Sequence, residues 1–244
     1  MSLQPLQPLC QDGDDEMRLT SRHLLQRHAR RFAWVVVLQP VLAAAVLTAA
    51  LRADNANKDA VPKPELDAKL AYCQVCHGAK GQGFRGYYAI PRLAGQQPEY
   101  FKNQLEAFIQ HRRTNVIMFN VAHVLSPAME TSLAASFQVF NPKPLGGAPK
   151  NVVAAGKKIY EEGIPDASVP PCSSCHGPQA KGDGQFPRLA GQLNDYIFNK
   201  LTDWSKERGQ NPANPDASAI MEPIAHSLTK AQIEAVAAYV SYLE

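Results

Sequence analysis

Strand-like alternation of apolar and polar residues is missing from this 244-residue sequence, and so is a marked excess of acidic or basic residues. Because no segment alternates over the length of a β-strand, the sequence predicts an all-α protein. The formal net charge is only +3, and no run of Lys or Arg occurs outside the N-terminal segment, which disfavours nucleic acid as a partner. Charged residues at 19% and hydrophobic residues at 45% indicate a globular chain rather than a disordered one.

A continuous apolar segment occurs only once, between Phe32 and Leu51. It follows the basic stretch TSRHLLQRHARR, and Thr48-Ala49-Ala50 near its end offers the small residues of a cleavage site. This order is typical of an export signal, but about twenty apolar residues also suffice to span a bilayer. A cleaved signal and a retained membrane anchor through residues 32–51 both stay open, whereas a buried core helix fits poorly because the segment has no polar face. Both favoured interpretations place the rest of the chain outside the cytoplasm.

The chain contains an internal repeat. The segment IPRLAGQQPEYFKNQLEAF from Ile90 returns as FPRLAGQLNDYIFNKLTDW from Phe186, and MFNVAHVLSPAM from Met118 matches MEPIAHSLTKAQ from Met221. The offset grows from 96 to 103, so the second copy has seven additional residues, in the Pro- and Asn-rich stretch QNPANPDASA. The duplication predicts two small domains, joined by a linker in NPKPLGGAPKN and preceded by an N-terminal extension. The predicted bounds are 1–56 for the extension, 57–145 for the first domain and 146–244 for the second.

Helical spacing of apolar residues predicts matching helices in the two copies. One helix precedes each of two cysteine pairs and a second, amphipathic one follows. The last helix of each copy has a start signal, because Ser126 stands before a proline and Thr229 stands three residues before Gln232 in a capping box. The predicted pairs of helices are 60–78 with 152–163, and 98–113 with 194–208.

Both copies carry the pattern Cys-x-x-Cys-His. A covalent c-type haem needs two thiols on one turn, which reach the two vinyl groups of one macrocycle, and an adjacent histidine that points its imidazole at the iron. The pattern therefore predicts two covalently bound haem c groups per chain. The predicted thioether cysteines and proximal iron ligands are Cys73, Cys76 and His77 in the first copy, and Cys172, Cys175 and His176 in the second.

The cysteines have three alternative uses. A thioredoxin-like redox pair would lie near a βαβ pattern, which is missing. The four cysteines could together bind a structural zinc ion, but such a site does not require a histidine after each pair or a duplicated module. Two disulfides are the third alternative. Cys10 lies in the N-terminal extension and has no evident role.

A proximal histidine leaves each haem iron in need of a sixth ligand. Met118 and Met221 occupy equivalent places before the last helix of each copy, in stretches rich in loop residues, whereas Met129 has no methionine counterpart. A thioether favours the ferrous state and raises the reduction potential. We therefore expect Met118 and Met221 to be the axial ligands. His123 and His226, five residues after each methionine, form the alternative pair of ligands.

Residues around the iron ligands also align in the two copies. Pro91 and Pro187 follow the haem histidines, and their carbonyls could accept a hydrogen bond from the histidine Nδ1 and fix its orientation; the alternative is a pair of turn prolines. Aligned arginines could pair with haem propionates: Arg92 with Arg188, and Arg112 with Arg208.

These features together resemble a known family. The doubled Cys-x-x-Cys-His, PRLAGQ with a tyrosine four residues later, and a methionine before Ala-x-x-Leu-Ser/Thr are similar to cytochrome c4, the two-domain dihaem class I cytochromes c. The resemblance covers about residues 64–244. It implies two helical cytochrome c domains, each wrapped around a covalent haem, and an electron carrier of the periplasm that is not an enzyme. It also implies partners: a quinol-oxidising bc complex as donor and a cbb-type terminal oxidase as acceptor.

The resemblance leaves some properties open. The chain would be soluble in the periplasm after signal cleavage or anchored to the inner membrane. Two alternative functions are the cytochrome subunit of a periplasmic dehydrogenase and a dihaem peroxidase, which needs one iron without a firm distal ligand. The family's last helix usually carries an aromatic residue that packs on the first helix. Tyr239 suits this in the second copy, but the first copy has Ser136 there, followed by Phe137.

Overall fold

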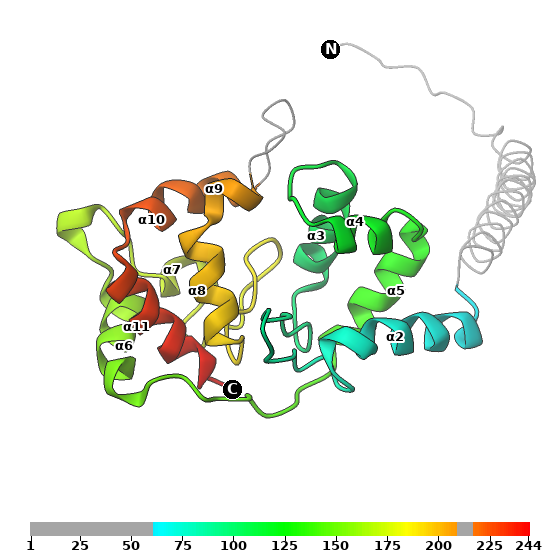
Figure 1. Cartoon of the computed structure of the whole chain (residues 1–244), viewed down its shortest axis with the longest axis horizontal. Helices are drawn as coiled ribbons and strands as arrows, with labels where there is room; N and C mark the ends of the chain where they lie inside the picture. Colours follow the sequence, from blue (N-terminus) through cyan, green and yellow to red (C-terminus); the bar gives the residue numbers. More distant parts are fainter. Residues whose placement is uncertain (1–60, 209–216) are drawn as a thin grey trace, which may run out of the picture. The chain divides into compact units, whose positions relative to one another are not determined.

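A computed structural model describes residues 61–208 and 217–244 (Figure 1). The apolar segment 32–51, Cys10 and most of the QNPANPDASA stretch lie outside these ranges. The described residues form helices, short 3₁₀ turns and isolated β-bridges but no strand, which confirms the mostly helical class. Within these same ranges, none of the helices has the length and hydrophobicity to cross a membrane. The α-helices are α2 (Lys63–His77), α3 (Pro98–Ile109), α4 (Val116–Ala122), α5 (Pro127–Gln138), α6 (Val153–Glu162), α7 (Ser173–His176), α8 (Asn194–Thr202), α9 (Trp204–Glu207), α10 (Met221–Ser227) and α11 (Lys230–Ser241).

The predicted starts of the last helices are confirmed. At the start of α5, the Ser126 hydroxyl accepts a hydrogen bond from the Met129 backbone N–H. At the start of α11, Thr229 and Gln232 form the predicted capping box, in which each side chain bonds the other's backbone N–H. These bonds satisfy amide groups that the first turn of a helix leaves without a partner.

Other helix predictions need correction. The single helix predicted over 194–208 is divided into α8 and α9, because Asp203 leaves the helical conformation at φ −108° and ψ 28°. Met118 and Met221, expected in loops, lie in the short helices α4 and α10. The first cysteine pair lies within the continuous helix α2, whereas a loop separates α6 from the second pair at α7.

Each copy has its own hydrophobic cluster, built from the apolar faces that the helical spacing predicts. The helices of the first copy, α2 to α5, group together in Figure 1, and so do the main helices of the second copy. The buried aromatic and larger aliphatic residues of the first cluster are Phe101, Leu105, Phe108, Met129, Leu133 and Phe137. Those of the second cluster are Tyr160, Ile197, Val236 and Val240.

The first and last helices of the second copy approach closely. A Cβ atom added at Gly156 of α6 would lie 1.9 Å from the Ala235 carbonyl oxygen of α11, so only glycine permits this crossing. One turn away, the rings of Tyr160 and Tyr239 pack with centroids 5.5 Å apart. In the first copy, Phe137 is fully buried and stacks on Phe101 of α3, with centroids 5.6 Å apart. The aromatic residue of α5 therefore packs on α3, whereas Tyr239 of α11 packs on Tyr160 of α6 in the second copy.

Hydrogen bonds join the two copies in a nearly symmetric way. The Gln96 side chain accepts a bond from the Arg188 backbone N–H at 2.7 Å and donates to the Arg188 carbonyl at 3.2 Å. The Gln192 side chain makes the same pair of bonds to the Arg92 backbone, at 2.8 and 3.0 Å. All four residues are buried. The two PRLAGQ segments thus face each other, and the glutamine side chain of each bonds main-chain atoms of the other.

Candidate haem sites

The two cysteine pairs present thiols in the same manner. Cys73 and Cys172 are half-buried against the cluster of their own copy, whereas Cys76 and Cys175 are exposed. All four are free thiols in the described chain. The zinc alternative is not supported, because no three His, Cys, Asp or Glu residues within the described ranges come together as metal ligands. One half-buried and one exposed thiol on a single turn suit attachment to the two vinyl groups of one macrocycle.

Both haem histidines are buried and held by a proline carbonyl. The Nδ1 of His77 lies 2.8 Å from the Pro91 oxygen, and the Nδ1 of His176 lies 2.9 Å from the Pro187 oxygen. A carbonyl can only accept, so Nδ1 carries the proton and Nε2 keeps a free lone pair in the neutral ring. Burial lowers the pKa of both imidazoles, which favours the neutral form that binds a metal. The arrangement leaves Nε2 of each histidine available to an iron.

A tight loop brings each proline back to its histidine. The backbone N–H of Gly182 donates to the His176 carbonyl at 2.9 Å, and Asp183 and Phe186 exchange two hydrogen bonds across a two-residue turn. Gly182 has φ +68°, and a Cβ atom there would lie 2.2 Å from the Phe186 oxygen. The first copy closes its loop between Phe84 and Ile90 instead. Its three additional residues enlarge a turn that exposes Tyr87 and Tyr88.

The structure places the candidate sixth ligands on short helices. Met118 is half-buried in α4, packs against the same cluster as Cys73, and has its backbone N–H bonded to the Asn115 side chain. Met221 is half-buried at the first residue of α10. The alternative ligands are exposed and already hydrogen-bonded, His123 to the carbonyl of Phe119 and His226 to the Ser205 hydroxyl. This geometry favours the methionines as ligands.

Two buried arginines directly follow the prolines whose carbonyls hold the haem histidines. Arg92 donates from Nε and Nη1 to the carbonyls of Ala94 and Pro142, and Arg188 donates from Nε to the carbonyl of Ala190. Burial, followed by the nearby charge of Arg188, lowers the pKa of Arg92 to about 10. The buried Nη2 of Arg188 has no hydrogen-bond partner. Two neighbouring buried cations with spare donors suit an anionic group, so these residues fit a propionate-bearing cofactor.

Arg113, which directly follows the predicted Arg112, was not among the residues that the sequence predicted for the site. Arg112 bonds Gln110 and Asn103, whereas the guanidinium of Arg113 lies 4.7 Å from the centroid of the Phe108 ring. Arg208 lies at the same 4.7 Å over the ring of Trp204. Arg113, rather than Arg112, is therefore the structural counterpart of Arg208. The first copy has one more residue before this arginine, and His111 adopts a left-handed conformation at φ 56° in that segment. Spacing gave no signal for Arg113, because Arg112 follows Phe108 by the same four positions by which Arg208 follows Trp204.

Comparisons with known proteins find similarity to cytochromes c and to an electron-acceptor protein. The cytochrome c family model matches residues 153–244. Cytochrome c-552 of Acidithiobacillus ferridurans is 38% identical over 70% of this chain and 73% of its own length. The thiosulfate dehydrogenase electron acceptor of Thiomonas intermedia is 35% identical over 84% and 92%. Cytochrome c4 of Thiocapsa roseopersicina is 38% identical over 70% and 86%. The solved structure of cytochrome c4 from Acidithiobacillus ferrooxidans has a TM-score of 0.62 and 36% identity over 71% of this chain and 99% of that one.

Proposed function

Because this chain belongs to the cytochrome c4 family, we propose that it accepts electrons from a quinol-oxidising bc complex and passes them to a cbb-type terminal oxidase. The family assigns it two covalent haem c groups and the role of an electron carrier rather than an enzyme. We place this transfer in the periplasm, with residues 32–51 either removed on export or kept as an anchor. The observation that carries the proposal is the doubled site, in which each copy has its own thiol pair and buried histidine.

Each group of residues has a defined task in this proposal. Cys73, Cys76, Cys172 and Cys175 attach the cofactors, and bound haem iron supplies a reversible one-electron change. His77 and His176 offer Nε2, while the Pro91 and Pro187 carbonyls hold the opposite ring nitrogen and make the imidazole a better donor. The Met118 and Met221 thioethers raise the reduction potential and leave no position for a substrate. Arg92 and Arg188 neutralise propionate charge inside the protein.

A second candidate donor is thiosulfate dehydrogenase. The observation that favours it is the 35% identity with a protein named as the electron acceptor of that enzyme, over 92% of its length. In this case the chain would work as the cytochrome partner of a periplasmic dehydrogenase and would perform the same one-electron transfer. The two proposals name different electron donors, but both use the same two candidate haem sites of this chain.

Stopped-flow reduction distinguishes the two donors. The oxidised chain is mixed with bc complex and quinol, and in parallel with thiosulfate dehydrogenase and thiosulfate, while haem absorbance reports reduction. We expect the bc complex to reduce both haems at a second-order rate constant at least tenfold higher, which corresponds to about 1.4 kcal/mol. Faster reduction by the dehydrogenase would assign the second donor, and failure of both would contradict the proposal.

Conservative substitution of Met118 tests the axial ligand. Met118→Leu keeps the size of the side chain and removes the sulfur, so about half of the weak red absorption band of methionine-ligated ferric haem should disappear. Met221→Leu should remove the other half. Met129→Leu is the matched control, because Met129 is buried in the same copy at 2% exposure and the change should cost less than about 1.5 kcal/mol. An unchanged band in Met118→Leu would contradict ligation by Met118.

A further inference from the structure

The turn that closes the loop at the first haem site is larger than its counterpart in the second copy. In the second copy, two residues join Asp183 to Phe186. In the first copy, five residues join Phe84 to Ile90 across the equivalent bridge. We call residues 84–90 the tyrosine loop. The two turns stand at equivalent places in the repeat, so their uses can be compared directly.

The shorter turn of the second copy takes part in the contact between the copies. Asn103 of α3 donates a hydrogen bond to the Gln185 side chain at 2.9 Å. The Gln97 side chain, at the start of the same helix, donates to the carbonyls of Lys181 and Gly182 at 3.0 and 3.1 Å. Both ends of this turn are therefore bonded to the first copy.

The tyrosine loop contributes to this contact through Arg85. The Arg85 guanidinium donates to the Gly146 carbonyl of the linker at 2.9 Å and lies 3.6 Å from the Asp195 carboxylate of α8. Tyr87 and Tyr88 are 95% and 77% exposed, and their rings pack edge-on against each other with centroids 4.8 Å apart. The tip of the loop thus extends beyond the contact that its base makes.

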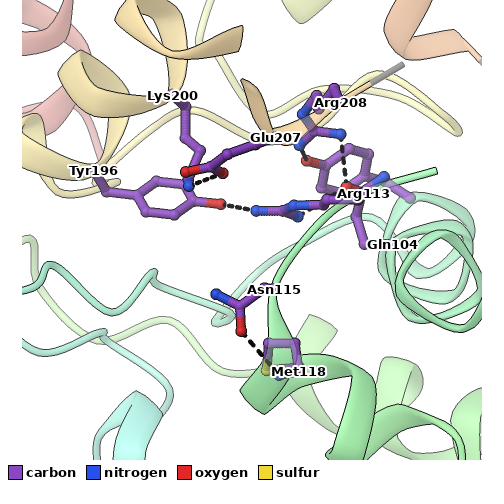
Figure 2. A network of polar contacts seen from close by, with 9 residues as sticks. Gln104, Arg113, Asn115, Met118, Tyr196, Lys200, Glu207 and Arg208 are labelled. Atoms are coloured by element: carbon purple, nitrogen blue, oxygen red, sulfur yellow. Dashed lines mark hydrogen bonds and ion pairs between the residues drawn. The ribbon is translucent and has the colours of Figure 1, made fainter. Parts of the chain in front are cut away.

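Other residues hold the copies together without the exposed tyrosines. Figure 2 shows Arg113 of the first copy bonded to the Tyr196 hydroxyl of the second, at 2.7 Å. Arg113 and Arg208 both donate to the same Gln104 oxygen at 2.9 Å. These bonds and the two glutamine–arginine pairs described above join the copies, so the tyrosine pair is available to another molecule.

A bound haem leaves the end of the tyrosine loop on the other side of its histidine. Pro91 directly follows the loop, and its carbonyl lies 2.8 Å from Nδ1 of His77. The iron would bind Nε2, the other ring nitrogen. The loop therefore ends behind the imidazole, away from the iron, and the connection from loop to ligand is a single residue. A molecule bound to the loop would lie next to the first haem site.

The charge around the tyrosine loop has one sign. Residues 68–98 contain no Asp or Glu, whereas Lys80, in the turn before the loop, and Arg85 within it are exposed. The turn of the second copy has the carboxylate of Asp183 instead. Exposed tyrosines with cations beside them complement a protein surface that has an apolar centre and acidic residues around it, and Tyr and Arg are enriched in the cores of such contacts.

We propose that the tyrosine loop docks a redox partner protein with an acidic contact face. One electron then passes between this partner and the iron at His77, so that one is oxidised as the other is reduced. Tyr87 and Tyr88 supply rigid contact area, and the charges of Lys80 and Arg85 guide the encounter. Because Arg85 also bonds the linker and α8, the docked partner extends the contact that already joins the copies. This inference rests on the proposed function as an electron carrier.

Replacement of both tyrosines by serine tests the docking in the full-length holoprotein. Stopped-flow mixing is done with bc complex and quinol, with thiosulfate dehydrogenase and thiosulfate, and, for the reduced chain, with cbb-type oxidase and oxygen. With at least one partner, Tyr87→Ser with Tyr88→Ser should lower the second-order rate constant at least about tenfold, the effect of losing two aromatic anchors. Reduction by dithionite, which needs no docking surface, should not change. Val124→Ala is the matched control, because Val124 is a 61% exposed apolar residue of the same copy, between α4 and α5.

Two further measurements separate docking from other effects. Lys80→Gln should slow the same reaction at low salt and not at high salt, because salt screens exposed charges. Lys158→Gln, an equal change of net charge on the exposed face of α6, should slow it less. Redox titration should give unchanged potentials in the serine variant, since the bond between Pro91 and His77 is untouched. A shifted first potential would assign the loop to ligand positioning and overturn the proposal.

Three other results would also contradict docking at this loop. The first is an equal rate for the serine variant and the unaltered chain with every partner that reacts. The second is binding to phosphatidylglycerol vesicles that the serine variant loses, which would assign the loop to a membrane surface. The third is an unaltered chain that reacts with none of the three partners. In that case the proposed function itself fails, and the docking proposal fails with it.

Discussion

A chain in which Cys73 and Cys76 are both replaced by serine should carry one covalent haem instead of two. Serine cannot form a thioether, and the buried His77 alone does not attach the macrocycle covalently. Denaturation and acid extraction release a non-covalent haem, so the haem that remains with the polypeptide counts the intact sites. We expect the count, read from the reduced pyridine adduct, to fall by half.

The duplicated sequence supplies matched controls for this experiment. Cys172→Ser with Cys175→Ser should give the same count but keep the absorption band that depends on Met118. Cys10→Ser, which changes the cysteine outside both pairs, should keep two haems. A count that stays at two in either paired variant would contradict covalent attachment at that pair. Loss of both haems from one paired variant would show that the two copies cannot mature independently.

Gly156→Ala should destabilise the chain by about 1–3 kcal/mol, the usual cost of overpacking a close-packed interior. The added methyl would lie 1.9 Å from the Ala235 oxygen and 2.9 Å from the Cβ of Tyr239. Helix α6 must then move away from α11, and the Tyr160–Tyr239 contact loosens with it. The higher helix propensity of alanine, about 1 kcal/mol, offsets only part of this loss.

Guanidinium unfolding of the holoprotein, followed by far-UV circular dichroism, measures the change in midpoint. Lys158→Ala on the same helix is the control, because Lys158 is exposed and its ion pair with Glu162 is long, at 4.0 Å; it should change stability by less than about 0.5 kcal/mol. Equal midpoints for Gly156→Ala and the unaltered chain would mean that the helices do not cross at this glycine.

Local features could be predicted from the sequence because a few neighbouring residues determine them. The start of α11 follows from Thr229 and Gln232 alone, and a proline carbonyl near each histidine follows from the position of Pro91 and Pro187 in the repeat. The division of the helix at Asp203 could not be predicted, because the apolar spacing continues through it.

The equivalence of Arg113 and Arg208 could not be predicted for a different reason. Aligning the copies without gaps pairs Arg208 with Arg112, and the pairing changes only once His111 is seen in a left-handed conformation. Arg113 donates a hydrogen bond to the Tyr196 hydroxyl of the opposite copy, and periodicity within one segment carries no information about such contacts. Packing between the copies, rather than local propensity, decides this part of the candidate site.

The reciprocal bonds of Gln96 and Gln192 have a consequence for the history of the chain. Each glutamine bonds the backbone of an arginine in the other copy, which is the pattern of an isologous contact between identical subunits. A single-haem ancestor that paired with itself would have had this contact already, and fusion of its genes would have preserved it. Because the partners are main-chain atoms, surrounding side chains can diverge without loss of the bonds. The two halves were thus free to specialise while their association stayed fixed.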